Sequence, residues 1–409
     1  MNSKNLLSAS KPLQNQRVLL AVTGSIAACK ADRIIKVLRN SGARVQVLLT
    51  EDGARFFPPQ TAGALTGQPV LNDMWSDADP GEMIHLEAIE NSDLILVAPA
   101  TANRILQIKH PAASDLLSTV ITAFRGPVFY APAMNPRLWK NKELQKIVNE
   151  YQEQIIAPVN GVMACGDVGP GRLAEPENIV ETLIARWWPE LFAGQKWFVS
   201  GGGSKEAWDD IRYLGNRSSG RMGEALARQL ARLGADVELV TAAQEQFYPN
   251  PGYSRVEVET AADMHEYLQN NMDNNSGYIG AAAVADYRPV SVSGKIKSGQ
   301  DELTVKLKKN PDIISELRKS YPEAILVGFS ADDSRGPEKA GEKARSKQLD
   351  AVVFNSLRQH DGGMGSEFNR NVFIVPPNFI RSLGRANKNE IALQLLLWLE
   401  KLKITPGVN

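Results

Sequence analysis

The stretch that decides the fold is Arg17–Val22, RVLLAV, which passes directly into TGSIAACK (23–30) and an amphipathic segment ending near Arg39. A short apolar run, a Gly/Ser turn and a helical pattern predict a strand, a tight turn and a helix. The first turn of such a helix offers free backbone N–H groups and a partial positive charge, which suit a phosphate. The turn contains neither G-x-G-x-x-G nor G-x-x-x-x-G-K-[ST], so a plain strand–helix turn remains an equal alternative.

Three further apolar runs each end in small or polar residues. They are RVQVLLT (44–50), DLILVAPATAN (93–103) and PVFYAPAMN (127–135), with helical patterns between them. Near-continuous apolar strands that alternate with helices predict a mainly parallel sheet with helices on both faces, whose ligands bind outside the carboxyl ends of the strands. The residues at these ends are Gly24, Ser25, Thr50, Thr101, Ala102, Asn103, Ala133, Met134 and Asn135. We expect them to converge on one crevice.

The second half of the chain repeats this order of elements. A chain of 409 residues fits two domains of about 200 residues each. RWWPELFAGQ (186–195) ends a helical pattern and KWFVS (196–200) opens a new strand, so the predicted domains are residues 1–193 and 194–409. We expect the α/β fold class, with a flavodoxin-like or Rossmann-like sheet in each domain.

Two glycine-rich turns follow the first strand of the second half. SGGGS (200–204) and SSGRMG (218–223) precede a helical pattern, an arrangement that can cradle an anion, although an ordinary turn is the alternative. The next strand, Asp236–Thr241, ends without the acidic residue that would hold a ribose, which counts against NAD.

Composition excludes several classes of protein. The 46 basic and 46 acidic residues cancel, so no global field attracts nucleic acid or an anionic membrane. The sequence has neither a signal peptide nor an apolar run of about 18 residues, and we expect a soluble, cytoplasmic protein. The two cysteines, Cys29 and Cys165, are too few for a disulfide framework and have no zinc-type spacing.

Three residues in the first half are candidates for chemistry, and each has a structural alternative. Cys165 lies in the glycine-rich segment GVMACGDVGPGRLAEP (161–176), which favours a reactive thiol on a flap over an inert buried cysteine. His85, in EMIHLEA, is a lone histidine beside apolar neighbours, and such a residue is more often packed or on the surface than catalytic. Asn135 could simply cap a helix that begins at Pro136.

Lysines recur at three places in the second half. They lie in GKIKS (294–298), in KKNPDII (308–314) and in EKARSK (342–347), where Lys343 and Lys347 share one helix face. A solvated surface charge is the alternative for each lysine. The small residues of YIGAAAVADYRP (278–289) would let a ligand approach the backbone before Asp286.

The first half resembles a known family. TGSIAACK, MIHLEA, APATAN, DLLST, PAMNPRLW and ACGDVGPGRLAEP are similar, in this order, to motifs of the flavin-dependent decarboxylase half of the bifunctional phosphopantothenoylcysteine decarboxylase/phosphopantothenate cysteine ligases of coenzyme A biosynthesis. The resemblance implies that FMN occupies the crevice, that His85 and Asn135 handle the substrate carboxylate and thiol, and that Cys165 is the proton donor on a flap. The FMN-binding residues that it implies are Gly24, Ser25, Ile26, Thr50, Thr101, Asn103, Ser118 and Met134.

The second half resembles the ligase part of the same family through GGGSKE, DIRYLGNRSSGRMG, AAAVADYRP, KIK, KNPDI, VGFSADD and EKARSKQLD. This resemblance implies CTP as co-substrate, Arg212 and Asn216 acting on phosphopantothenate and its acyl-cytidylate, and Lys295 as the main catalytic cation. The implied CTP-binding residues are Ala281, Ala282, Ala283, Asp286, Lys295, Pro311, Asp312, Ile313, Ile314, Phe329, Lys343 and Lys347. Mg2+ would accompany CTP, with Asp286 as its candidate ligand, because lysines and a metal ion lower the barrier between two anions.

The match has departures. Cys29, Pro111, Leu138, Ser204 and Ser298 replace residues that the family usually has at these positions, and QHDGGMGSEFNRNVFIV (359–375) resembles its closing loop only loosely. The family also implies a homo-oligomer, up to a dodecamer. A regulatory or scaffold flavoprotein and a flavin enzyme acting on another cysteine-like carboxylate, such as a peptide C-terminus, are alternatives, which the joint presence of His85, Asn135 and Cys165 and of a ligase half disfavours.

Overall fold

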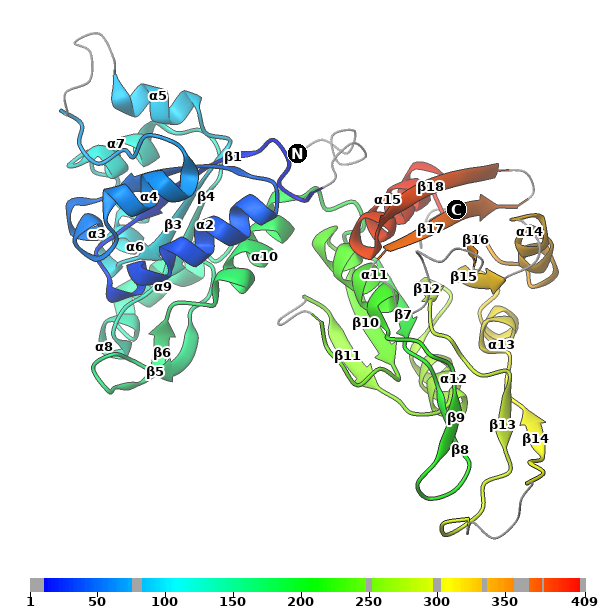
Figure 1. Ribbon diagram of the computed structural model, residues 1–409. Helices are drawn as coiled ribbons and strands as arrows, with labels where there is room; N and C mark the ends of the chain where they lie inside the picture. Colours follow the sequence, from blue (N-terminus) through cyan, green and yellow to red (C-terminus); the bar gives the residue numbers. More distant parts are fainter. Residues whose placement is uncertain are drawn as a thin grey trace. The chain divides into compact units, whose positions relative to one another are not determined.

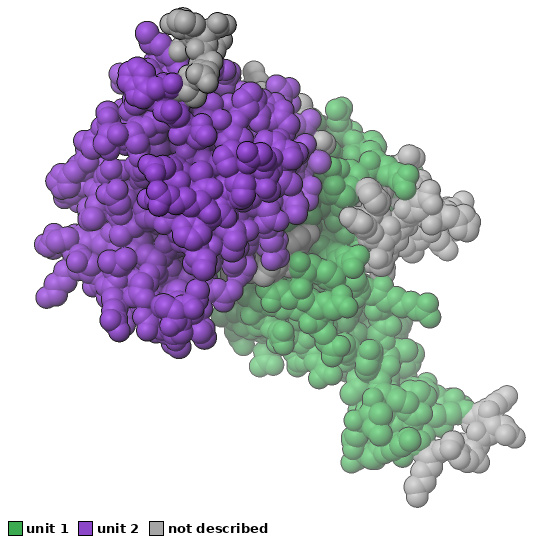
Figure 2. All heavy atoms as spheres, turned by 60° about the vertical axis from the view of Figure 1, so that its left-hand side comes forward, with its two compact units in different colours: residues 1–7, 188–409 green, residues 8–187 purple. Residues whose placement is uncertain are grey.

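The segment Arg17–Val22 forms strand β1 inside a parallel sheet, as its sequence predicts. The computed structural model describes residues 11–75, 83–247, 252–296, 303–332, 337–356, 368–376 and 379–404. The described residues form two compact units that divide between Trp187 and Trp188. The first unit in chain order ends at Trp187 and is purple in Figure 2, where the key names it unit 2; the second begins at Trp188 and is green, named unit 1 in the key. Phe192 packs edge-on against Trp197 of the second unit, so the packing boundary lies before the predicted domain boundary at 193/194.

The first unit contains a four-stranded parallel sheet in the order β2-β1-β3-β4. Its strands are β1 (Arg17–Val22), β2 (Arg44–Leu49), β3 (Leu94–Ala100) and β4 (Val128–Pro132). Its helices are η1 (Ile26–Lys30), α2 (Ala31–Asn40), α3 (Glu51–Phe56), α4 (Pro59–Thr66), α5 (Ile84–Glu90), α6 (Ala102–Lys109), α7 (Leu116–Ala123), α8 (Pro136–Trp139), α9 (Lys142–Glu150) and α10 (Pro176–Trp187).

Helices cover both faces of this sheet (Figure 1). Leu19 and Ala21 of β1 join one core cluster with residues of α5, α6, α7 and α9. Side chains alternate along a strand, so Leu20 and Val22 are buried on the other face, where α2 packs against α4 and α10. The predicted α/β architecture is therefore confirmed for the first unit.

A glycine-rich hairpin follows this sheet in the chain. Its strands are β5 (Val159–Val162) and β6 (Val168–Arg172), which pair antiparallel and leave residues 163–167 at the tip. The predicted ordered flap is therefore a β-hairpin, and it packs against α8.

The second unit contains an eight-stranded sheet in the order β11-β10-β7-β12-β15-β16-β17-β18. Its strands are β7 (Lys196–Gly201), β10 (Asp236–Thr241), β11 (Ser254–Glu257), β12 (Ser276–Gly280), β15 (Ile325–Asp332), β16 (Ala351–Ser356), β17 (Phe368–Val375) and β18 (Phe379–Asn387). The first six strands of this set run parallel, whereas β17 and β18 add an antiparallel edge. The mainly parallel sheet is confirmed. The expected closing loop at 359–375 is in part strand β17, and its residues 359–367 lie outside the described residues.

Helices again cover both faces (Figure 1). They are α11 (Arg221–Arg232), α12 (Ala261–Asn271), α13 (Ile313–Ser320), α14 (Pro337–Ser346) and α15 (Lys388–Lys401). Residues of α12, α13 and α14 share a core cluster with Phe198 and Leu326, whereas α11 and α15 pack on each other and on other parts of the sheet. Among the described residues no helix is long and apolar enough to cross a membrane.

An arm of short strands completes the second unit. It consists of β8 (Lys205–Ala207), β9 (Tyr213–Gly215), β13 (Tyr287–Pro289) and β14 (Leu307–Lys309). An isolated bridge between Asp209 and Val292 joins its two hairpins. Figure 1 shows these strands extending away from the large sheet.

Two candidate active sites

A cavity of about 530 Å³ lies at the carboxyl edge of the first sheet. The residues that line it are Thr23, Gly24, Leu48, Leu49, Thr50, Glu51, Asp52, Asn72, Asp73, Met74, Trp75, Thr101, Asn103, Arg104, Ser114, Asp115, Leu116 and Leu117. They include four of the eight predicted cofactor-binding residues, namely Gly24, Thr50, Thr101 and Asn103. The turns after β1, β2 and β3 thus meet at one crevice, as expected for a parallel sheet.

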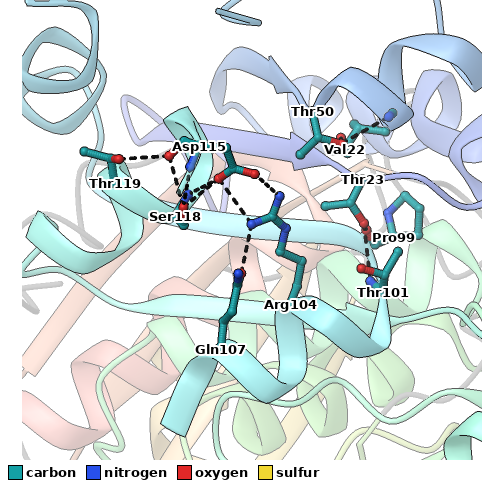
Figure 3. Close-up of polar contacts among 11 residues, drawn as sticks. Val22, Thr23, Thr50, Pro99, Thr101, Arg104, Gln107, Asp115, Ser118 and Thr119 are labelled. Carbon is teal, nitrogen blue, oxygen red and sulfur yellow. Dashed lines mark hydrogen bonds and ion pairs between the residues drawn. The ribbon is translucent and has the colours of Figure 1, made fainter. Parts of the chain in front are cut away.

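Hydroxyl groups tie these turns together (Figure 3). The Thr23 hydroxyl donates to the Pro99 carbonyl at 2.7 Å and accepts from the Thr101 N–H at 3.3 Å, which joins the ends of β1 and β3. Thr50 caps α3 by accepting from the Gly53 N–H at 3.1 Å. A Cβ on Gly24 would lie 2.3 Å from the Asp52 Cβ, so the first turn leaves room only for glycine.

The other four predicted cofactor residues do not line this cavity. Ser25 caps η1 by accepting from the Ala27 N–H, and the next residue, Ile26, is 60% exposed. The backbone N–H of Met134 donates to Gly171 of the hairpin. Ser118 is buried, and its hydroxyl completes a capping box with Asp115 at the start of α7. Cofactor contacts of these four residues remain predictions.

An ion pair in this cavity was missed by sequence reasoning. The buried guanidinium of Arg104 binds the Asp115 carboxylate with both terminal nitrogens, and one of them also donates to Gln107 at 2.8 Å (Figure 3). Burial alone would raise the pKa of Asp115, but the bonds from Arg104 and Ser118 outweigh it and lower the pKa. Asp115 lies in the quoted DLLST motif, yet nothing in the spacing of the two residues indicates their contact.

The structure brings together two of the three predicted chemical residues of the first unit. The Asn135 side-chain nitrogen lies 3.5 Å from the Cys165 sulfur and 2.8 Å from a carboxylate oxygen of Asp167, while its oxygen accepts from the Arg137 N–H at 2.8 Å. Asn135 therefore does cap α8, and it also contacts the flap. Cys165 is exposed at the hairpin tip.

His85 does not join this pair within one chain. It is half-buried in the first turn of α5. Figure 1 places α5 at the opposite end of the first unit from β5 and β6. A single copy of the chain thus leaves His85 apart from Cys165.

A second cavity, of about 340 Å³, lies at the carboxyl edge of β12 and β15 in the second unit. Nine of the predicted nucleotide-binding residues line it: Ala282, Asp286, Pro311, Asp312, Ile313, Ile314, Phe329, Lys343 and Lys347. Ala281, Ala283 and Lys295 are not among its lining residues, so their nucleotide contacts remain predictions. The motifs thus located most of this cavity.

An ion pair dominates the electrostatics of the second cavity. The Lys347 ammonium lies 2.6 Å from a carboxylate oxygen of Asp312, whose other oxygen caps α13 at the Ser315 N–H. Burial alone would raise the pKa of Asp312, but the hydrogen bond and charge of Lys347 together with the bond from Ser315 outweigh it and lower the pKa. Lys343, one helical turn away, is exposed.

Three further residues of this cavity were not singled out from the sequence. Asn310 is buried, donates to the Ala285 carbonyl at 2.8 Å and accepts from Arg288 at 2.8 Å, so it links the two loops that line the cavity. Ser200 and Tyr278 share a buried hydrogen bond of 2.9 Å, and burial raises the pKa of Tyr278 to about 12. All three lie in segments quoted above, KNPDI, SGGGS (200–204) and YIGAAAVADYRP (278–289), but nothing in those segments indicates that Ser200 and Tyr278 contact each other.

A third cavity, of about 260 Å³, follows the triple glycine. Asn216 lines it together with Gly203, Lys205 and Ser218, and its side chain donates to the Ala283 and Val284 carbonyls at 3.1 and 3.2 Å. Asn216 thus connects this cavity to the loop that lines the second cavity.

Arg212 and Lys295 both lie on the arm. Arg212 binds the Asp209 carboxylate and the Ile296 carbonyl, and its bond to Asp209 holds the pKa of that carboxyl far below its usual range. Lys295, the neighbour of Ile296, is exposed. Neither residue lines one of the three cavities described above. Asp286 belongs to no group of three or more His, Cys, Asp or Glu side chains suited to a metal, among the residues that the structure describes.

Comparison with known proteins assigns both units. Residues 6–187 match the family model described as "Flavoprotein", and residues 192–402 match the "DNA/pantothenate metabolism flavoprotein C-terminal domain". The coenzyme A biosynthesis bifunctional protein CoaBC of Bacillus subtilis (strain 168) is 35% identical over 402 residues, 97% of this chain and 99% of the relative. CoaBC of Escherichia coli (strain K12) is 36% identical over 368 residues, 87% of this chain and 90% of the relative.

Two solved structures are also similar. The C-terminal domain of a CoaBC protein is 28% identical and covers 52% of this chain and 98% of its own, with a TM-score of 0.44. A cysteine-to-serine mutant of PPC decarboxylase in complex with pantothenoylaminoethenethiol is 29% identical and covers 42% of this chain and 99% of its own, with a TM-score of 0.38.

The two matched models define the class: a flavoprotein domain joined to a domain of pantothenate metabolism. Because the similarity extends over nearly the whole length, it also identifies the family: the chain belongs to the coenzyme A biosynthesis bifunctional proteins CoaBC. The family indicated by the motifs is therefore confirmed, as is the prediction that the chain is a bifunctional enzyme of coenzyme A biosynthesis.

Proposed function

We propose that this chain catalyses two consecutive steps: CTP-dependent ligation of 4'-phosphopantothenate with cysteine through an acyl-cytidylate, then FMN-dependent decarboxylation of the product to 4'-phosphopantetheine. We assign decarboxylation to residues 1–193 and ligation to residues 194–409. One observation carries the proposal. Each large sheet has a cavity at its carboxyl edge, and the family motifs contribute residues to both cavities.

The first cavity fits FMN. The turn at Gly24, which admits only glycine, lets the phosphate approach the backbone, and Thr50, Thr101 and Asn103 offer polar groups to its ribityl chain. FMN would supply the redox chemistry, taking two electrons from the substrate thiol so that the adjacent carboxylate can leave as CO2 and returning them to the enethiol that remains. Residues of the chain would bind and protonate the substrate. Asn135 would orient the carboxylate and thiol of the substrate, and Cys165 would donate a proton to it from the flap.

The second cavity suits a nucleotide triphosphate. Lys343 and Lys347 supply cationic groups, and Mg2+ would neutralise further phosphate charge, with Asp286 as candidate ligand. The neighbouring cavity that Asn216 lines would take phosphopantothenate. Lys295 would act on the acyl-transfer step from the arm.

A homo-oligomer, up to a dodecamer, would bring together predicted site residues that lie apart in a single copy of the chain. Helix α5, which contains His85, lies at the opposite end of the first unit from β5 and β6, whose connection contains Cys165, and Lys295 does not line the second cavity. We expect a second copy to bring such residues into each site. The other partners are the small-molecule substrates, without nucleic acid or membrane, and the expected location is the cytoplasm.

The test uses the purified protein with 4'-phosphopantothenate, cysteine, CTP and Mg2+, and follows pyrophosphate and CO2. We expect both products, and neither when CTP is omitted. Absence of CTP-dependent pyrophosphate release would exclude the proposed ligase activity. Absence of CO2 with added phosphopantothenoylcysteine would favour the alternative, an FMN-binding regulatory or scaffold protein.

A further inference from the structure

One carboxylate at the tip of the flap has no role in the proposed chemistry. Asp167 lies two residues after Cys165 and is half-buried. Its side chain accepts a hydrogen bond of 2.8 Å from the Asn135 amide, which also lies 3.5 Å from the Cys165 sulfur. Asp167 thus shares its partner with the thiol.

The base of the hairpin is anchored independently of Asp167. A Cβ on Gly171, whose φ is +120°, would lie 2.4 Å from the Met134 carbonyl oxygen, and Gly171 accepts from the Met134 N–H at 2.9 Å. A Cβ on Gly169 would touch Pro136 at 3.2 Å. Close backbone approach therefore holds the base against residues 134–136, whereas the contact of Asn135 with Asp167 and Cys165 holds the tip.

Asp167 also determines which end of the Asn135 amide faces the thiol. An ionised carboxylate only accepts hydrogen bonds, so it selects the NH2 end of the amide. The amide oxygen is held on the other side by the Arg137 N–H at 2.8 Å. Together the two bonds fix a single orientation, in which the NH2 group points toward Cys165.

We propose that Asp167 is a positioning residue of the decarboxylase site: it latches the flap tip to Asn135 and so sets the place of the Cys165 thiol. The inference rests on the proposed decarboxylase function. Proton donation by Cys165 would then depend on the Asp167 carboxylate, which itself touches no reacting atom.

The test compares Asp167→Ala, which removes the acceptor, with Asp167→Asn, which keeps an acceptor oxygen without the charge. Hydrogen–deuterium exchange is measured for the peptide 159–172 of the full-length protein, where the tip bonds from Met163 N–H to Asp167 and from Gly166 N–H to Met163 report on order. We expect exchange at the tip to be roughly five-fold faster in Asp167→Ala, because a charge-assisted bond is lost, and close to wild type in Asp167→Asn.

Turnover is measured on the same proteins. We expect the kcat of CO2 release to fall by about ten-fold in Asp167→Ala and to recover to within about three-fold in Asp167→Asn, the scale of one hydrogen bond to a charged group. Ligation in the second unit and bound flavin serve as internal controls and should not change. The KM for phosphopantothenoylcysteine should change less than kcat, because the donor and not the binding site is displaced.

Two results would overturn the proposal: wild-type exchange in Asp167→Ala, or wild-type CO2 release despite faster exchange. Failure of the proposed function is recognised separately. If the wild-type protein releases no CO2, the decarboxylase assignment falls, and the exchange comparison alone decides whether Asp167 latches the tip.

Discussion

Lys347 and Asp312 face each other across 2.6 Å in the cavity of the second unit, and both line it. The lysine that we assign to the CTP phosphates is thus paired with a carboxylate of the protein itself. The pair holds Lys347 in place, since Asp312 is fixed at the start of α13. A triphosphate must then compete with Asp312 for the same ammonium group.

Replacement of Lys347 by methionine should weaken CTP binding. We expect the KM for CTP to rise by about ten-fold, the scale of one charge-assisted contact, with the KM for cysteine unchanged. Initial rates of pyrophosphate release at varied CTP provide the measurement. Lys339→Met is the matched control, because Lys339 is exposed on α14, the helix that ends just before Lys347, and does not line the cavity. Equal effects of the two substitutions would contradict the assignment.

Four of the positions that line the first cavity were predictable from the sequence. Gly24, Thr50, Thr101 and Asn103 each follow a strongly apolar run, and parallel strands present their carboxyl ends at one edge. The order of strands and helices is enough to predict these positions, whichever strands pair with each other.

Contacts between distant side chains were not predictable in this way. Arg104 meets Asp115 only because the start of α6 lies against the start of α7, and Tyr278 meets Ser200 because β12 pairs with β7. These bonds depend on tertiary packing, for which a single sequence contains no periodic signal. The separation of His85 from Cys165 escaped prediction for the same reason, because the motifs give an order along the chain and no distance.

Asp115→Asn should destabilise the first unit and weaken the binding of FMN. Asparagine still caps α7, so the change isolates the loss of the carboxylate beside the buried Arg104. We expect a loss of about 1–3 kcal/mol in the free energy of unfolding, reduced from the value for a fully buried pair because Asp115 is partly exposed. Denaturant unfolding and the dissociation constant of FMN give the two readouts. Glu150→Gln, which breaks the exposed pair with Lys109 of α6, should change neither.

The same pair predicts a pH dependence. The pKa of Asp115 in the folded protein lies below its ordinary value of 3.8. Its contribution to stability is therefore fully present above the ordinary pKa and is lost as the pH falls through the lower folded value. The difference in unfolding free energy between wild type and Asp115→Asn should shrink below about pH 4. A difference that stays constant from pH 7 to pH 3 would show that the carboxylate charge is not responsible.

Cys165→Ser should separate the two activities. We expect the variant to retain flavin and wild-type ligation but to stop before decarboxylation is complete, because a serine hydroxyl is a far weaker acid than a thiol. The measurement is formation of 4'-phosphopantetheine beside pyrophosphate release. Cys29→Ser removes the other cysteine and should leave both steps unchanged. Full turnover by Cys165→Ser would exclude the thiol as proton donor.

Lys295→Gln should impair ligation alone. Lys295 is exposed on the arm and lies outside the nucleotide cavity, so it does not support the fold of the second unit, and the variant should unfold like the wild type. If an arm delivers this charge to the acyl-transfer step, its loss should lower the kcat of CTP-dependent ligation by about 100-fold, as for removal of one electrostatic stabiliser of a transition state. Decarboxylation of added phosphopantothenoylcysteine should stay at the wild-type rate. Lys308→Gln is the control, since Lys308 is exposed on the same arm and does not line the cavity. If both variants ligate normally, the catalytic cation must lie elsewhere, and Lys309, which does line the cavity, becomes the next lysine to replace.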